Sequence, residues 1–192
     1  AQACQQNDKD FWIVIQLNSR NDQTDPPVPL STEQLQIQAY TAMTFGVRSI
    51  NWACWNPGWF NNNIVDGSGN KTEQYDKVKL VNEETAKLSP VFMKYKYVDA
   101  NIIGEKQIEC KSFYRNDDNV IKQDVFIAVS MSEKTTSSVL SSYFEKKQGD
   151  GSAMMFVNIT DPICEEKTSA PVTFKVADAN SVVTEHTAHG SY

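Results

Sequence analysis

The sequence predicts an α/β fold in its first half and an antiparallel all-β fold in its second half. Strand and helix signals alternate over residues 1–100, whereas residues 101–192 hold short strand candidates separated by turns. Parallel strands joined by helices produce the first pattern, and a small antiparallel β-sandwich produces the second. We therefore expect two domains, residues 1–100 and residues 101–192.

The first strand is expected at residues 11–17, where FWIVIQL is a run of strand-forming residues. Such a run is typical of a parallel strand that is covered on both faces. A polar, proline-rich loop follows over residues 18–29. Ser31 and Gln34 then form a capping box, which predicts the start of an amphipathic helix that ends at Gly46.

A second strand is expected at residues 47–54, which completes a strand–helix–strand unit with a right-handed crossover. Residues 55–63 follow as a loop that is dense in aromatic and amide side chains, and a turn starts at Asp66. Thr72 is placed to cap a second helix, and Pro90 marks the expected end of that helix.

An open alternative is that the second helix continues through residues 91–97 after a break at Pro90, and the second half starts at residue 101. A glycine-rich turn over residues 148–152 lies between two apolar segments and predicts a hairpin. The strand candidates are residues 106–114, 124–131, 138–146, 153–159, 171–177 and 181–185.

Composition excludes two classes of partner. The 192-residue chain has a formal net charge of −6, so it lacks the excess of Lys and Arg that a nucleic acid or an anionic membrane requires. No stretch approaches the roughly 18 consecutive apolar residues of a transmembrane helix. We expect no nucleic-acid partner and no membrane span. The opening residues read as the tail of a helix, which suggests that the sequence begins partway through a larger α/β domain.

No metal site and no cofactor are expected. The cysteines contain no C-x-x-C pair, which excludes zinc ribbon and thioredoxin-like motifs, and reduced, buried thiols are the expected state. An H-x-x-H pair near the C-terminus is expected to belong to a disordered terminus rather than to a metal site. The cysteines are Cys4, Cys54, Cys110 and Cys164, and the histidine pair is His186 and His189.

Candidate ligand-binding residues collect where the two parallel strands end. The first strand end carries Gln16 and Asn18, and the second carries Trp52, Trp55 and Trp59. Flat aromatic faces beside amides suit a neutral sugar, whose C–H face packs on a ring while its hydroxyls bond to amides. The alternative, that the tryptophans are core residues, stays open at this stage, most evenly for Trp52.

Catalytic carboxylates are not evident at these strand ends. Glycoside hydrolysis requires two carboxyl groups that flank the scissile bond. The nearest candidates are Asp22, Asp25 and Asp66, and each lies in a polar turn, where a capping role is the expectation.

Three segments of the first half resemble the end of the catalytic barrel in bacterial glycoside hydrolases, especially β-galactosidase family 42. These segments are FWIVIQLNS, LSTEQLQIQAYTAMTFGVRSINWACW and IVDGSGNKTEQYDKVKLVNEETAKLSP. The resemblance implies a partial (β/α)8 barrel, made of the last two βα units and followed by an antiparallel β-sandwich. It also implies an extracellular or cell-surface protein that binds an oligosaccharide or polysaccharide.

The resemblance places Gln16 where the family has its nucleophilic glutamate, and Trp52 and Trp55 on a sugar-stacking surface. An amide cannot serve as an ionised nucleophile, and the family's general acid comes from a fourth strand that this sequence does not contain. The resemblance therefore implies that the chain is a C-terminal fragment of a glycoside hydrolase-like protein. Such a fragment contributes sugar-contacting residues but is inactive alone. Its sheet would be completed by the missing upstream barrel segment or by a second copy of the chain.

Two alternatives remain open. The chain is a non-catalytic carbohydrate-binding or adhesion module that uses Trp55 and Trp59 as its platform, or an interaction protein whose exposed sheet edge recruits a partner.

Overall fold

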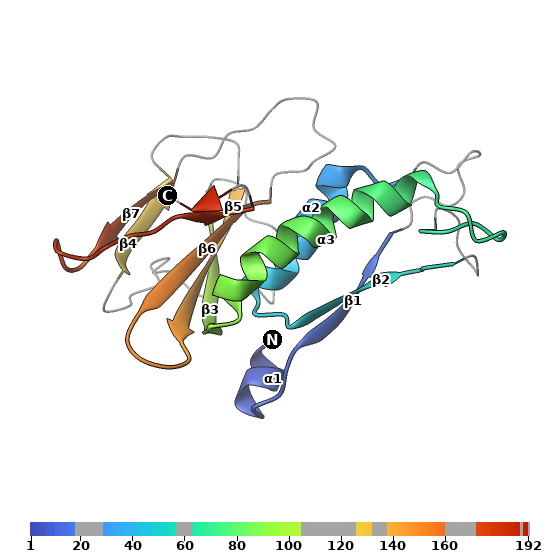
Figure 1. The fold of residues 1–192 in the computed structure, drawn as a ribbon. Helices are drawn as coiled ribbons and strands as arrows, with labels where there is room; N and C mark the ends of the chain where they lie inside the picture. The colour runs from blue at the N-terminus through green and yellow to red at the C-terminus, as the bar shows by residue number, and fades with distance from the viewer. Residues whose placement is uncertain are drawn as a thin grey trace. The chain divides into compact units, whose positions relative to one another are not determined.

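The computed structural model describes residues 1–17, 29–56, 63–104, 126–131, 138–159, 172–188 and 190–191. The chain forms two compact units (Figure 1). The first unit comprises Ala1–Met43 and Val47–Pro90, and the second comprises Thr44–Gly46 and Val91–Tyr192.

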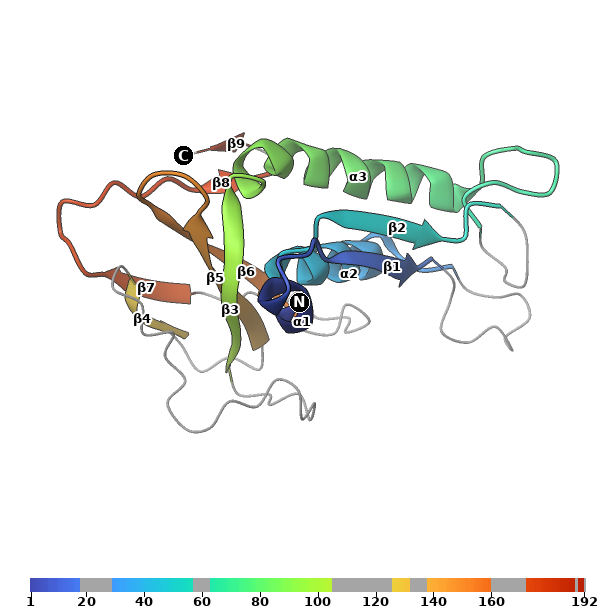
Figure 2. The same ribbon diagram turned by 90° about the horizontal axis from the view of Figure 1, so that it is seen from below.

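The first unit is built on a pair of parallel strands. Its elements in chain order are α1 (Gln2–Gln6), β1 (Trp12–Gln16), α2 (Thr32–Thr44), β2 (Ser49–Ala53) and α3 (Glu73–Phe92). The register runs from Trp12 opposite Ser49 to Gln16 opposite Ala53, and the two strands lie side by side pointing the same way (Figure 2). The expected strand–helix–strand unit is therefore confirmed.

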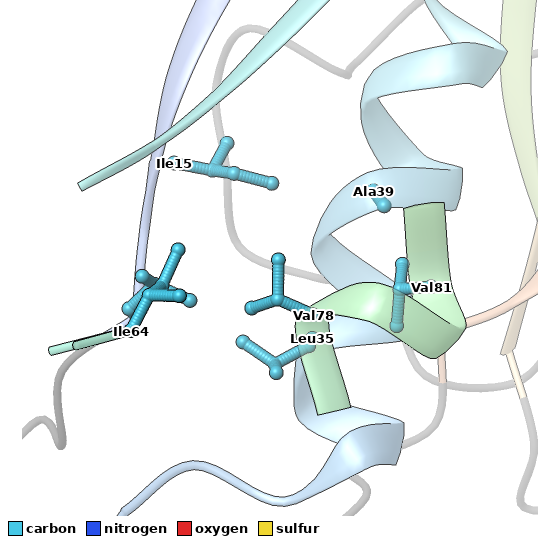
Figure 3. Packing of buried hydrophobic residues seen from close by; sticks show 7 residues of the cluster. Ile15, Leu35, Ala39, Ile64, Val78 and Val81 are labelled. Carbon is cyan, nitrogen blue, oxygen red and sulfur yellow. The ribbon is translucent and has the colours of Figure 1, made fainter. Parts of the chain in front are cut away.

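Apolar side chains from both helices pack against one face of this pair. The buried cluster joins Ile15 and Leu17 to residues of α2, α3 and the segment between β2 and α3; those residues are Leu35, Ala39, Ile64, Val78 and Val81. Figure 3 shows these side chains converging between the strands and the helices. Trp12 and Val14, which alternate with the buried positions, are each 67% exposed. The expectation that this strand is covered on both faces is wrong, because the described elements cover one face only.

Local capping signals set the helix boundaries as expected. The Ser31 backbone N–H donates to Gln34 Oε1 (2.9 Å), and the Gln34 N–H donates to Ser31 Oγ (3.2 Å), which is a complete capping box. Thr72 Oγ1 accepts from the Gln74 N–H (3.2 Å) at the start of α3. Gly46 follows α2 with a φ of 75°, the left-handed conformation that glycine adopts most readily.

A buried carboxylate links the two long helices. Glu84 on α3 is 6% exposed, and its oxygens accept hydrogen bonds from Gln36 Nε2 (3.1 and 2.9 Å) and from the Tyr40 hydroxyl (2.9 Å). Gln36 and Tyr40 lie one turn apart on α2. Each donor therefore satisfies a charge that would be costly to bury alone.

The end of α3 differs from the expectation. Pro90 lies inside the helix, which continues to Phe92. Proline lacks the N–H that would bond to the Ala86 carbonyl, and Ala86 is exposed, so water can solvate that carbonyl. The residues that follow form a strand rather than a helical extension, because β3 covers Tyr95–Gly104.

The second unit contains small antiparallel sheets. β3 pairs with β5 (Ser138–Lys146), and β5 pairs with β6 (Ser152–Asn158). β4 (Phe126–Met131) pairs with β7 (Val172–Val176), and β8 (His186–Thr187) pairs with β9 (Gly190–Ser191). The hairpin expected around residues 148–152 is confirmed as the β5–β6 connection.

The central strand β5 is buried on both faces. On one face Phe144 meets Tyr97 and Phe92 edge-to-face, with ring centroids 6.0 and 5.6 Å apart. On the other face Tyr143 packs against Val98, Met154 and Val176, and its hydroxyl lies 2.6 Å from Ser152 Oγ. Aromatic side chains therefore pack on both sides of this strand, which also buries Val139 and Leu140.

The expected fold class, a partial (β/α)8 barrel followed by a β-sandwich, is wrong. The described residues form a mixed α/β structure with three helices and with sheets of two and three strands. A barrel requires strands that close on one another, and in the described ranges β1 and β2 pair only with each other. Of the expected sandwich strands, residues 106–114 lie outside the described residues and residues 181–185 are irregular.

Replacing Glu84 tests the link between α2 and α3. Glu84→Ala leaves Tyr40 and Gln36 without their acceptor and should lower the free energy of unfolding by about 2–3 kcal/mol, measured by urea denaturation. The adjacent Glu83 is exposed and pairs with Lys79 at 3.8 Å, so Glu83→Ala is the matched control and should change the value by less than about 0.5 kcal/mol. Equal effects of the two substitutions would contradict the role of Glu84.

Alkaline pH tests the same cluster from the side of Tyr40. Burial, the hydrogen bond to Glu84 and the Glu84 charge raise the pKa of Tyr40 above its usual value. Stability from this group is therefore complete below the unfolded-state pKa of about 10 and is lost as the pH rises through the folded-state pKa. The free energy of unfolding should fall above pH ~10 more steeply in the wild-type chain than in Tyr40→Phe. Parallel pH profiles of the two proteins would exclude this contribution.

Substitution of Gly46 tests how closely the backbone after α2 approaches Tyr97 of β3. A Cβ added at Gly46 would lie 2.5 Å from Tyr97 Cβ, in addition to the positive φ. Gly149 provides the control, because it has a similar φ of 72° and a Cβ added there would meet nothing within 4 Å. Gly149→Ala should cost about 1–2 kcal/mol from backbone strain, and Gly46→Ala should cost clearly more. Similar losses in thermal or urea unfolding would show that Tyr97 does not constrain this position.

Candidate functional site

The segment between β2 and α3 is held in place by backbone hydrogen bonds. The Val65 N–H donates to the Trp55 carbonyl (2.9 Å), and the Thr72 N–H donates to the Ile64 carbonyl (3.1 Å). Thr72 Oγ1 also donates to the Asn63 carbonyl (2.5 Å). Trp55 is thus anchored to the same segment that starts α3.

The Trp55 ring is exposed and is supported from one side by Tyr75. Trp55 is 58% exposed, and its ring meets the Tyr75 ring edge-to-face with centroids 6.5 Å apart and an interplanar angle of 66°. Lys71 Nζ lies 4.2 Å from the centroid of the Tyr75 ring, a cation–π contact. The arrangement holds a large aromatic surface open to solvent on the first unit.

A hollow of about 320 Å³ opens beside Trp55 along one side of α3. Its lining residues are Trp55, Ile64, Tyr75, Val78, Lys79, Asn82, Glu83 and Ala86. Apolar and aromatic side chains dominate, and three polar side chains from α3 join them. Lys79 and Glu83 pair with each other at 3.8 Å, so the part of the lining that the structure describes carries no net formal charge.

Trp52 forms a hydrogen bond with one of the residues that line the hollow. Trp52 Nε1 donates to Asn82 Oδ1 at 2.9 Å, and the Trp52 ring packs against the buried cluster of the first unit. Trp52 is not among the residues that line the hollow. Its indole N–H is therefore already bonded within the fold.

Gln16 lies on the opposite face of the strand pair from Trp52. Ile15 and Trp52 are register partners that face the core, whereas Gln16 is exposed and is the partner of Ala53. The Gln16 backbone is held by Gln38, whose Oε1 accepts from the Gln16 N–H (3.3 Å) and whose Nε2 donates to the Gln16 carbonyl (3.1 Å). The structure therefore does not bring Gln16 together with Trp52, and Asn18 and Trp59 lie outside the described residues.

The carboxylate of Asp66 is engaged in structural contacts within its own turn. Asp66 accepts from the backbone N–H groups of Ser68 and Asn70 (both 2.8 Å), and these hydrogen bonds lower its pKa. The expectation that Asp66 is a turn carboxylate is confirmed. Asp22 and Asp25 lie outside the described residues.

Metal ligands do not cluster in the described part of the chain. No group of three or more His, Cys, Asp or Glu side chains meets there. Cys4 and Cys54 are free and half-buried, whereas Cys110, Cys164 and His189 lie outside the described residues.

Four polar or aromatic residues of the hollow were missed by sequence reasoning: Tyr75, Lys79, Asn82 and Glu83. Their spacing of three to four residues places them on one side of a helix, beside the core stripe, and that spacing is the signal that could have grouped them.

The chain matches no protein-family model, no curated protein and no solved structure. No helix among the described residues has the length and apolar character needed to cross a membrane. The chemistry of the hollow is therefore the main guide to function.

Proposed function

We propose that this chain binds a neutral oligosaccharide in the hollow beside Trp55, as a non-catalytic part of a carbohydrate-active protein. The observation that carries the proposal is the exposed Trp55 ring, which lines the hollow together with the Tyr75 ring that supports it. An extracellular or cell-surface site of action, which the resemblance to glycoside hydrolases implies, belongs to the same proposal.

The chemistry of the lining supports a sugar over other small ligands. An indole ring stacks on the C–H face of a pyranose, and polar side chains at the edge of the hollow exchange hydrogen bonds with its hydroxyls. Asn82 and the Lys79–Glu83 pair supply such groups. Because the charges of Lys79 and Glu83 offset each other, the lining favours an uncharged sugar over a uronate or a sulfated sugar.

The composition of the hollow supports binding without hydrolysis. Acid–base hydrolysis of a glycoside requires two carboxyl groups at the scissile bond, and among the described residues Glu83 is the one carboxylate of the lining. Gln16, at the position implied for a nucleophile, has an amide and lies on the other face of the strand pair. An origin in a longer glycoside hydrolase remains a prediction.

A second candidate function rests on the uncovered face of β1. Trp12 and Val14 are each 67% exposed and adjacent on that face, which favours an interaction protein whose partner covers the strand pair. A second copy of the chain would serve as such a partner.

Two exposed tryptophans separate these candidates. Trp55→Ala should weaken oligosaccharide binding at least about tenfold, because the stacking surface is lost. Trp12→Ala, which removes another exposed indole, should leave oligosaccharide binding unchanged. Calorimetric titration with neutral gluco-, galacto-, manno- and xylo-oligosaccharides provides the measurement for both variants.

The opposite pattern would favour the interaction protein. In that case no oligosaccharide binds, light scattering gives a mass that rises with concentration, and Trp12→Ala lowers that mass. Wild-type sugar affinity in Trp55→Ala would exclude the hollow as the binding site.

A further inference from the structure

We infer that Trp52 is a positioning residue for the hollow: it holds the Asn82 side chain so that the amide nitrogen is the group offered to a ligand. The inference deepens the proposed function and rests on it, because it assigns polar recognition in the same hollow. It also gives Trp52 a role other than direct contact with sugar.

The hydrogen bond between the two side chains decides how the amide is turned. An indole N–H donates and cannot accept, so the atom that faces Trp52 Nε1 must be the amide oxygen of Asn82. The 2.9 Å distance joins these two atoms. The Trp52 ring is half-buried against the cluster that includes Val78 and Val81, so the ring is held in one place.

What remains of Asn82 is a pair of donors. Its Nδ2 carries two N–H groups, and no atom in the described ranges accepts from them. Asn82 lines the hollow between Lys79 and Glu83, which pair with each other across one turn of α3. The polar group that the hollow can commit to a ligand is therefore a donor with fixed orientation.

A donor of this kind selects an acceptor oxygen near the apolar face of the sugar. A hydroxyl, a ring oxygen or a glycosidic oxygen satisfies it, whether or not that oxygen carries a proton. A sugar that lacks an oxygen at this place leaves the amide nitrogen without its bond and loses affinity. The ligand class is thus a neutral pyranoside whose oxygen lies within reach of Asn82 when its C–H face stacks on Trp55.

The first experiment needs no ligand. In ¹⁵N-labelled protein, the Trp52 indole proton should exchange with solvent at least tenfold more slowly than the Trp55 indole proton, which has no partner among the described residues. Asn82→Ala should abolish most of that protection. Equal exchange of the two indoles, or protection that survives Asn82→Ala, would overturn the inference.

The second experiment uses the tightest-binding oligosaccharide of the calorimetric panel. Asn82→Asp keeps an acceptor for the indole but has no N–H to offer, so it should weaken binding at least tenfold. Trp52→Phe should weaken binding severalfold in the wild-type chain and have no further effect in Asn82→Ala. A residue that touched the sugar or merely supported the fold would show the same loss in both backgrounds, which would overturn the positioning role.

Failure of the inference and failure of the proposed function are distinguishable. Wild-type affinity in Asn82→Asp, together with loss of binding in Trp55→Ala, overturns the inference and leaves the proposed function in place. If the wild-type chain binds no oligosaccharide of the panel, the proposed function fails, and the role assigned to Asn82 fails with it.

Discussion

Mutual burial of β1, α2 and α3 is the constraint on which the rest of the first unit depends. A pair of parallel strands has no stability of its own, so it persists because the helices cover one of its faces. Leu17 and Leu35 are fully buried in that contact, and Gln74 at the start of α3 donates to the Leu17 carbonyl (2.9 Å). This last contact ties the carboxyl end of β1 to the beginning of the helix that carries most of the candidate site.

The helix α3 contributes residues both to the buried core and to the candidate site, from adjacent sides of the helix. Val81 faces the buried cluster and Glu84 faces α2, whereas Asn82 lies beside the hollow. Val78 borders both the buried cluster and the hollow. Because the core side fixes the rotation of the helix, it also fixes which polar side chains stand around Trp55. The binding properties of the hollow therefore depend on how the core-facing residues of α3 pack.

Features set by neighbouring residues could be predicted from the sequence. The Ser31–Gln34 capping box, the left-handed Gly46 and the parallel pairing of β1 with β2 all follow from local patterns, and the structure has them. The sheet arrangement of the second unit depends on contacts between distant segments, which no local pattern encodes. β3 was missed because the residues at its start, within 91–97, suit the continuation of a helix as well as a strand. The site residues on α3 were missed because their neighbour, Trp55, comes from another element.

The antiparallel sheet of the second unit has a consequence for the order in which its strands assemble. β5 and β6 are joined by a short glycine-containing turn between Lys146 and Ser152, so their pairing closes a small loop. Pairing of β3 with β5 brings together two strands that are separated by the residues between Gly104 and Ser138. Because this separation is longer than the hairpin turn, the pairing loses more chain entropy than formation of the hairpin does. The hairpin is therefore expected to act as the template on which β3 docks, with the Phe144–Tyr97 contact forming in the later step.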